Sequence, residues 1–393
     1  MRKLAILVLV VALYLLICPV GARAQEQTEI DPNKILDAQM EKIELSDLQE
    51  FIDQIDRDVG QYVPEISIRK FIDSLREGKI DFSFGSLLRG LGEFLFHELI
   101  KHSALMGKLV ILAVICAVLY NLLDAFEGTT GQVAYTIVYL VLIAIAIGSF
   151  TEAIKIGRES IDKMVSFVQT LLPLLLTLLA SIGGVSSAAL MHPFIMAALG
   201  LLGTLIKNFV FPLIYFSGIL GIISHINKKI KISNFAALLK DIGVASLGIF
   251  LTLFVGFLGL QGIAGVVVDS VTLKTAKFMT GTFVPVVGKM MADALEVIVG
   301  TSLLLKNAVG LIGVIILIVL CAFPVIKIIS LVIIYRLAAA LVQPIGESGV
   351  SDALQTMGNA LTLVFAAVAG VGLMFFIAIG VVVGVGNFNV MLR

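Results

Sequence analysis

The chain has 393 residues, of which 59% are hydrophobic and only 14% are charged, and its formal net charge is zero. So few charges exclude an ordinary soluble domain of this length, and the absence of a basic cluster argues against nucleic-acid binding. Because the apolar runs are continuous rather than alternating, we predict an all-α, polytopic helical membrane protein, not a membrane barrel. We expect about six to eight transmembrane helices, with possible re-entrant segments.

The first residues have the features of an export signal. Met1-Arg2-Lys3 is a cationic start, and residues 4–18 form an apolar run that is shorter than a typical transmembrane helix. Ala22-Arg23-Ala24 is a cleavage motif. We therefore expect residues 1–24 to be a signal peptide that delivers the following segment across the membrane.

Residues 25–104 are expected to form a small, acidic, extracytoplasmic helical domain. Ser46 opens a capping-box pattern, after which apolar residues from Leu48 to Val59 follow the 3.6-residue helical period. A second helix is expected after Pro64. Leu87 to Leu99 form a third apolar stripe, which we predict to lie along the membrane surface as an interfacial helix.

Residues 105–393 are expected to form the transmembrane helical domain. The apolar runs predict spans at 105–123, 132–150, 164–182, 186–206, 208–226, 242–262, 308–335 and 359–384. The segments 186–206 and 208–226 are either two crossings or a re-entrant pair. Residues 263–306 are too polar to span and too apolar to be solvated, so we expect an interfacial or re-entrant arrangement there.

Charge sets the expected sidedness of these spans. If residue 25 onward is outside, counting crossings places the 227–241 loop inside, and this loop holds the topology-setting residues Lys228, Lys229, Lys231 and Lys240. The 151–163 connection would then lie outside, where its acidic and basic residues alternate and cancel.

Two similar sequence units, a possible internal repeat, occur in the second half of the chain. Pro285 precedes Asp293-Ala294-Leu295 with the same spacing as Pro344 precedes Asp352-Ala353-Leu354, and the two triplets lie 59 residues apart. One interpretation is chance in a sequence of few residue types. The other is an inverted pair of broken or re-entrant helices, in which Pro285, Asp293, Pro344 and Asp352 would mark a translocation site.

Catalytic, metal and cofactor sites are not predicted. His97 and His102 are five residues apart, whereas a helical zinc motif needs four, and Gly281 to Lys289 has the wrong glycine spacing for a phosphate loop. Lys207 and Lys327 are the best candidates for functional intramembrane charges. Both lie near expected helix ends, where a lysine can reach the surface, so we favour that simpler role.

The glycines give a clearer indication of function than the few charged residues do. Small residues let membrane helices approach closely, so these glycines predict helix packing. These glycines pack either inside one bundle or against other subunits. The candidate helix-packing residues are Gly256, Gly259, Gly262, Gly265, Gly380 and Gly384.

Together, the signal ending at Ala24, the acidic helical segment, the two Pro/Asp units and the glycine-rich C-terminal spans resemble the stage III sporulation protein AE family of endospore-forming bacteria. The resemblance implies a multi-pass component of the transmembrane complex that links mother cell and forespore and is thought to act as a channel. It also implies a location in the mother-cell membrane around the forespore. The implied partners are a separate ATPase, ring-forming proteins and a forespore-side protein.

We therefore expect a non-enzymatic membrane subunit of a channel or secretion-like complex, permease-like or scaffolding, with no cofactor. The alternative is a stand-alone secondary transporter for a small solute, with broken-helix repeats around Pro285 and Pro344. A membrane enzyme ranks last, because few ionisable residues fall in the expected spans.

Overall fold

The computed structural model describes residues 46–64, 71, 74, 84–125, 129–225, 232–283, 287–345 and 348–391. Within these residues the chain is helical and contains no strand. The signal peptide expected at residues 1–24 and the following residues up to 45 lie outside the described residues.

The described chain is built from a few very long helices. The N-terminal segment contributes α3 (Ser46–Val59), the 3₁₀ turn η1 (Gly60–Tyr62) and α5 (Phe84–Lys101). The membrane body contributes α6 (Ser103–Ala125), α7 (Thr129–Ser181), α8 (Val185–Leu205), the π-helical turn η2 (Ile206–Val210), α9 (Phe211–Ile223), α10 (Ser233–Phe283), α11 (Val287–Val342), the 3₁₀ turn η3 (Gln343–Ile345) and α12 (Ser348–Met391).

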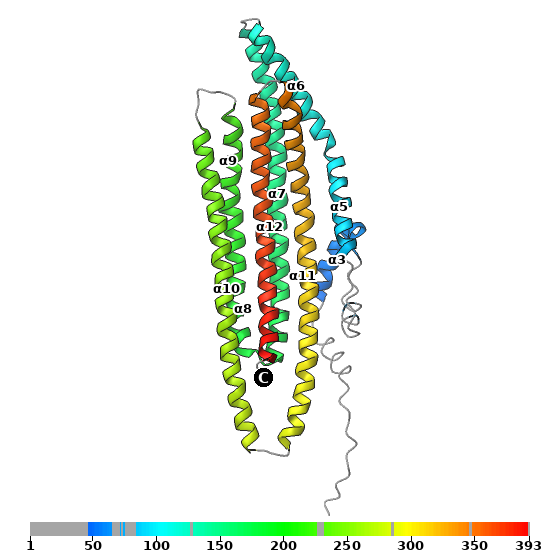
Figure 1. Ribbon diagram of the computed structural model, residues 1–393, viewed down its shortest axis with the longest axis vertical. Helices are drawn as coiled ribbons and strands as arrows, with labels where there is room; N and C mark the ends of the chain where they lie inside the picture. Colours follow the sequence, from blue (N-terminus) through cyan, green and yellow to red (C-terminus); the bar gives the residue numbers. More distant parts are fainter. Residues whose placement is uncertain are drawn as a thin grey trace, which may run out of the picture.

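The long helices stand side by side and run alternately up and down (Figure 1). Continuous columns are formed by α7, by α8 with η2 and α9, by α10, by α11 and by α12. The α6–α7 hairpin projects beyond the bundle at one end, and the α10–α11 hairpin projects beyond it at the other (Figure 1). Six helical segments in the described part are long and apolar enough to cross a membrane, which confirms the predicted all-α polytopic class.

The core lies where α7, α11 and α12 pack against one another. Two glycines allow this close approach: a Cβ at Gly313 on α11 would overlap Leu171 of α7, and a Cβ at Gly372 on α12 would overlap Cys321 of α11. Leu171 and Phe375 are among the fully buried side chains of this core. Gly313 and Gly372 are 59 residues apart, the same offset as the Asp-Ala-Leu triplets.

The prediction of two separate spans at 132–150 and 164–182 is wrong. Residues 129–181 form the single helix α7, which is 53 residues long and therefore about 80 Å at 1.5 Å per residue. The hydrocarbon core of a bilayer is about 30 Å thick. The charged 151–163 segment is consequently not a connection but the middle of a helix that carries one bilayer-length apolar segment on each side.

Two other segments also turn out to be parts of longer helices. The segments 186–206 and 208–226 are neither two crossings nor a re-entrant pair, because α8 continues through η2 into α9 as one column. Residues 263–306, for which an interfacial or re-entrant arrangement stays a prediction, are helical wherever the structure describes them. Residues 263–283 form the last part of α10 and residues 287–306 the first part of α11, in helices of 51 and 56 residues.

Candidate functional site at the charged waist

Charged side chains gather midway along the bundle, at a level we call the charged waist. It comprises residues 152–163 of α7, Lys207 at the start of η2, and Lys327 of α11. Along α7 itself, Lys155 and Glu159 are one turn apart and 4.0 Å from each other. The waist therefore separates the apolar surface of the bundle into two halves.

Contacts between helices hold the waist together. The ammonium group of Lys207 contacts the Asp162 carboxylate on α7, and Arg158 Nη2 donates a hydrogen bond to the backbone oxygen of Lys207 at 3.0 Å. The backbone around Lys207 is π-helical, and a π turn alters the usual pairing of backbone carbonyls. The arginine thus supplies a donor where the helix geometry is irregular.

A proline gives α11 a second irregularity at the same level. Pro324 has no backbone N–H, so the carbonyl of Leu320, four residues earlier, loses its helical donor. Ser160 of α7 approaches this carbonyl and donates a hydrogen bond to it at 3.5 Å. Neighbouring helices commonly satisfy backbone groups that a proline frees inside a membrane helix.

The N-terminal helix α3 docks on this waist. Its apolar side, predicted from the sequence, is confirmed: Leu48, Ile52, Ile55 and Val59 are buried. Phe51 packs edge-to-face on Phe167 of α7 with ring centroids 5.3 Å apart. In Figure 1, α3 lies beside α11 about midway along the bundle.

α5 continues this apolar contact. Phe94 of α5 packs edge-to-face on Phe323 of α11 at 4.8 Å and on Tyr62 of η1 at 5.1 Å. Glycine is needed at Gly90, because a Cβ there would overlap the backbone oxygen of Tyr62. The described N-terminal helices and the long helices therefore form one packed unit.

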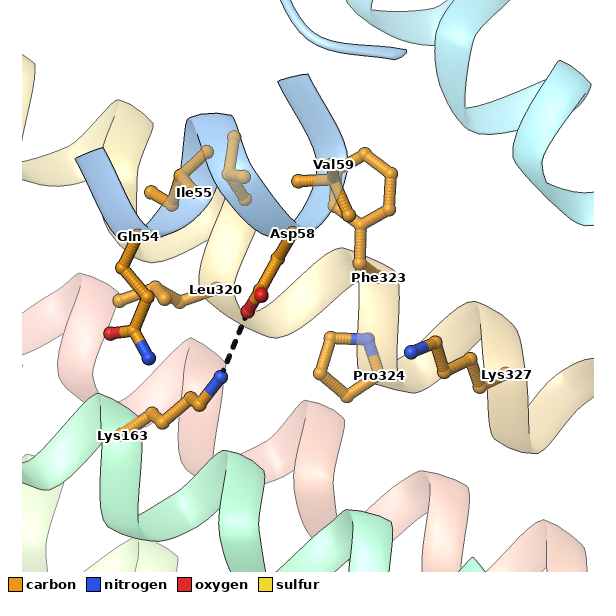
Figure 2. A pocket seen from close by; sticks show the side chains of 10 residues that line it. Gln54, Ile55, Asp58, Val59, Lys163, Leu320, Phe323, Pro324 and Lys327 are labelled. Carbon is orange, nitrogen blue, oxygen red and sulfur yellow. Dashed lines mark hydrogen bonds and ion pairs between the residues drawn. The ribbon is translucent and has the colours of Figure 1, made fainter. Parts of the chain in front are cut away.

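A pocket of about 230 Å³ opens between α3, α7 and α11 (Figure 2). Lys163 Nζ pairs with Asp58 Oδ2 at 3.1 Å across its mouth. Lys327 also lines the pocket, and its ammonium group lies 5.9 Å from the centroid of the Phe94 ring. The remaining lining is mostly apolar, from Ile55, Val59, Val319, Leu320, Phe323 and Pro324, with Gln54 at one side.

Two further charges are buried away from the waist, toward the end of the bundle that carries the α7–α8 turn. Asp269 of α10 is only 2% exposed and accepts hydrogen bonds from the backbone N–H groups of Ser186 at 2.8 Å and Ser187 at 3.1 Å, and from the Ser187 hydroxyl. Gly184 at the N-cap of α8 has no side chain to cap the helix. Asp269 therefore acts as a cap supplied by another helix.

Lys306 of α11 is the second buried charge, and it is fully buried. Its ammonium group donates to the Val383 carbonyl of α12 at 2.7 Å. It occupies the space left by Gly386, where a Cβ would overlap the lysine nitrogen. Within the described residues no carboxylate lies within 4 Å of this nitrogen.

The predicted packing glycines fall into two groups. A Cβ at Gly262 would lie 3.1 Å from Val381, and one at Gly265 would lie 2.9 Å from the Ser187 backbone, so both pack inside the bundle. A Cβ at the other four would meet nothing within 4 Å; these are Gly256, Gly259, Gly380 and Gly384. For these four, packing against another subunit stays a prediction.

The two Pro/Asp units are not brought together. Asp293 lies near the start of α11, whereas Pro344 in η3 and the exposed Asp352 follow its far end. α11 has 56 residues, so about 84 Å separates its ends. Pro285 lies outside the described residues. Of the topology-setting lysines, Lys240 is exposed on α10, while Lys228, Lys229 and Lys231 lie outside the described residues.

Sequence reasoning missed Asp58, Lys163, Asp269 and Lys306 as residues of these sites. Asp269 and Lys306 fall in the 263–306 segment that was not expected to span. A single charge within a long apolar helix was the available signal for both. Asp58 and Lys163 are 105 residues apart, and only their docking shows that they pair.

Long apolar helices with few internal charges define this chain as a polytopic helical membrane protein. The family model described as stage III sporulation protein AE matches residues 66–386. The chain is 43% identical over 355 residues to the stage III sporulation protein AE of Bacillus subtilis (strain 168), covering 89% of this chain and 88% of that protein. No solved structure matches the chain. The chain thus belongs to the stage III sporulation protein AE family and is a sporulation membrane protein.

Proposed function

We propose that this chain is a non-enzymatic subunit of a multiprotein channel complex in the sporulating cell, with a permease-like or scaffolding role. The proposal places it in the mother-cell membrane around the forespore. There it would act beside a separate ATPase and ring-forming proteins.

The observation that carries the proposal is the length of the apolar surface. α7 holds two bilayer-length apolar segments in one continuous helix, and a helix of about 80 Å cannot place both in a hydrocarbon core of about 30 Å. Exposed apolar side chains occur on both sides of the waist, with Ile137 on one side and Leu260 on the other at 57% and 69% exposure. Exposed apolar surface outside lipid favours protein partners that cover it.

The stand-alone transporter alternative has less support. It needs the units around Pro285 and Pro344 to meet near the bilayer midplane, whereas α11 separates their helix starts by its full length. The buried charges Asp269 and Lys306 are each engaged by helix backbone.

Affinity purification of the full chain from sporulating cells in mild detergent tests the proposal. We expect partner membrane proteins to be recovered in fixed stoichiometry. Recovery of the chain alone, together with solute uptake by liposomes that contain only this chain, would contradict the proposal and favour the transporter.

A further inference from the structure

We propose that the pocket between α3, α7 and α11 binds a phosphate group, and that its natural source is the headgroup of an anionic membrane lipid. The inference goes beyond the proposed function, because it concerns a ligand that the subunit would bind whether or not it acts in a channel.

The charges in the pocket favour an anion. Two ammonium groups, those of Lys163 and Lys327, line it, and Asp58 offsets only one of them. Lys327 has no carboxylate within 4 Å among the residues the structure describes. Its ammonium group instead faces the Phe94 ring at 5.9 Å, a contact that holds a cation in place without neutralising it.

The shape of the pocket favours an amphiphile. Figure 2 shows Lys163 and Lys327 reaching the cavity from two different helices, with Pro324 and Phe323 between them. A charged rim over an apolar wall matches a phosphate attached to a glycerol and acyl chains. Basic pockets between membrane helices are known binding places for anionic headgroups.

The proposal puts the pocket at headgroup depth. It lies on the charged waist, where the apolar surface of α7 is interrupted on its way from one half of the bundle to the other. The pocket is open, because the side chains of Lys163 and Asp58 are 40% and 56% exposed. A lipid at this level can present its phosphate to the lysines while its chains follow the neighbouring apolar helix surface.

The test uses the purified full chain in detergent micelles and the variant Lys327→Gln. Lys155→Gln is the matched control, since Lys155 also lies on the waist and pairs with Glu159 but does not line the pocket. Binding of phosphatidylglycerol and of phosphatidylcholine is titrated by native mass spectrometry. Inorganic phosphate is added in a separate arm, and thermal stability of all three proteins is recorded with each addition.

We expect phosphatidylglycerol to bind the wild type and Lys155→Gln equally well, and Lys327→Gln about tenfold more weakly, as expected for one lost charge-assisted contact. Stabilisation of the wild type by inorganic phosphate but not by the lipid, and its loss in Lys327→Gln, would support the phosphate site and assign it to a soluble ligand. If wild type and Lys327→Gln bind phosphatidylglycerol equally well, and also bind inorganic phosphate equally well, the proposal is overturned. The proposal is also overturned if neither phosphatidylglycerol nor inorganic phosphate binds the wild type.

Discussion

Removal of the Asp269 carboxylate tests the structure at its most specific polar contact. In Asp269→Ala, the first turn of α8 loses the acceptor of two backbone N–H groups and of the Ser187 hydroxyl. The site is almost completely buried, so water cannot readily replace the carboxylate.

The expected loss follows from these contacts. The two backbone N–H groups of the cap would each lose their acceptor inside the protein, at a cost of about 1–2 kcal/mol apiece. We therefore expect Asp269→Ala to lower the free energy of unfolding by about 3 kcal/mol. Asp269→Asn retains one acceptor oxygen and should cost about half as much.

Unfolding of the purified chain in mixed micelles, followed by circular dichroism as the denaturing detergent increases, measures these differences. Asp352→Ala is the matched control, because Asp352 is an exposed aspartate on α12 and should change stability by less than about 0.5 kcal/mol. A loss for Asp269→Ala no larger than that of the control would refute the interhelical cap.

Three other predictions follow from the packing. Gly380→Leu combined with Gly384→Leu should leave insertion and stability intact but lower the recovery of partner proteins, because both positions face open space. Gly265→Leu should instead destabilise the chain by clashing with Ser187. Co-purification of partners and measurement of thermal stability separate the two cases. Phe51→Ala should free α3 from the waist and speed its cleavage in limited proteolysis. The reason is that the aromatic pair stabilises the docked helix by about 1 kcal/mol beyond the contribution of burying the ring. Unchanged cleavage would contradict the docking. Lys306→Met should leave thermal stability unchanged or raise it, because an apolar side chain of similar volume replaces a buried ammonium group whose acceptor among the described residues is the Val383 carbonyl. A large loss of stability would show that the Val383 contact is essential.

The class of the fold was predictable because apolar run length reports directly on lipid burial. The same argument correctly gave the buried side of α3 from the 3.6-residue period of Leu48, Ile52 and Ile55. These properties are local, so a single segment of sequence is enough to reveal them.

Helix continuity was not predictable from the same local pattern. The charges from Glu152 to Lys163 resemble a solvated connection when each segment is judged alone. In the structure, Asp162 and Lys163 instead find partners in Lys207 and Asp58, far away in the sequence. Such pairing lets a helix continue through a charged segment, and it depends on tertiary contacts.

The candidate site was hidden for a related reason. Lys327 was noticed as a charge near a helix end, yet its pocket is completed by Asp58 and Ile55 of the N-terminal helix α3. Glycine spacing also indicated close packing without its direction. Gly262 and Gly265 face a neighbouring helix, whereas Gly256 and Gly259, on the same helix, face outward.

The distance between the two halves of α7 tests the central claim most directly. Spin labels at Ile137→Cys and Thr177→Cys, in a chain whose native cysteines are replaced, can be measured by double electron–electron resonance. A continuous α7 places these positions 40 residues apart on one helix, so the predicted separation is about 60 Å. A separation below about 20 Å would mean that the two apolar segments fold back as neighbouring antiparallel spans, and it would contradict the account.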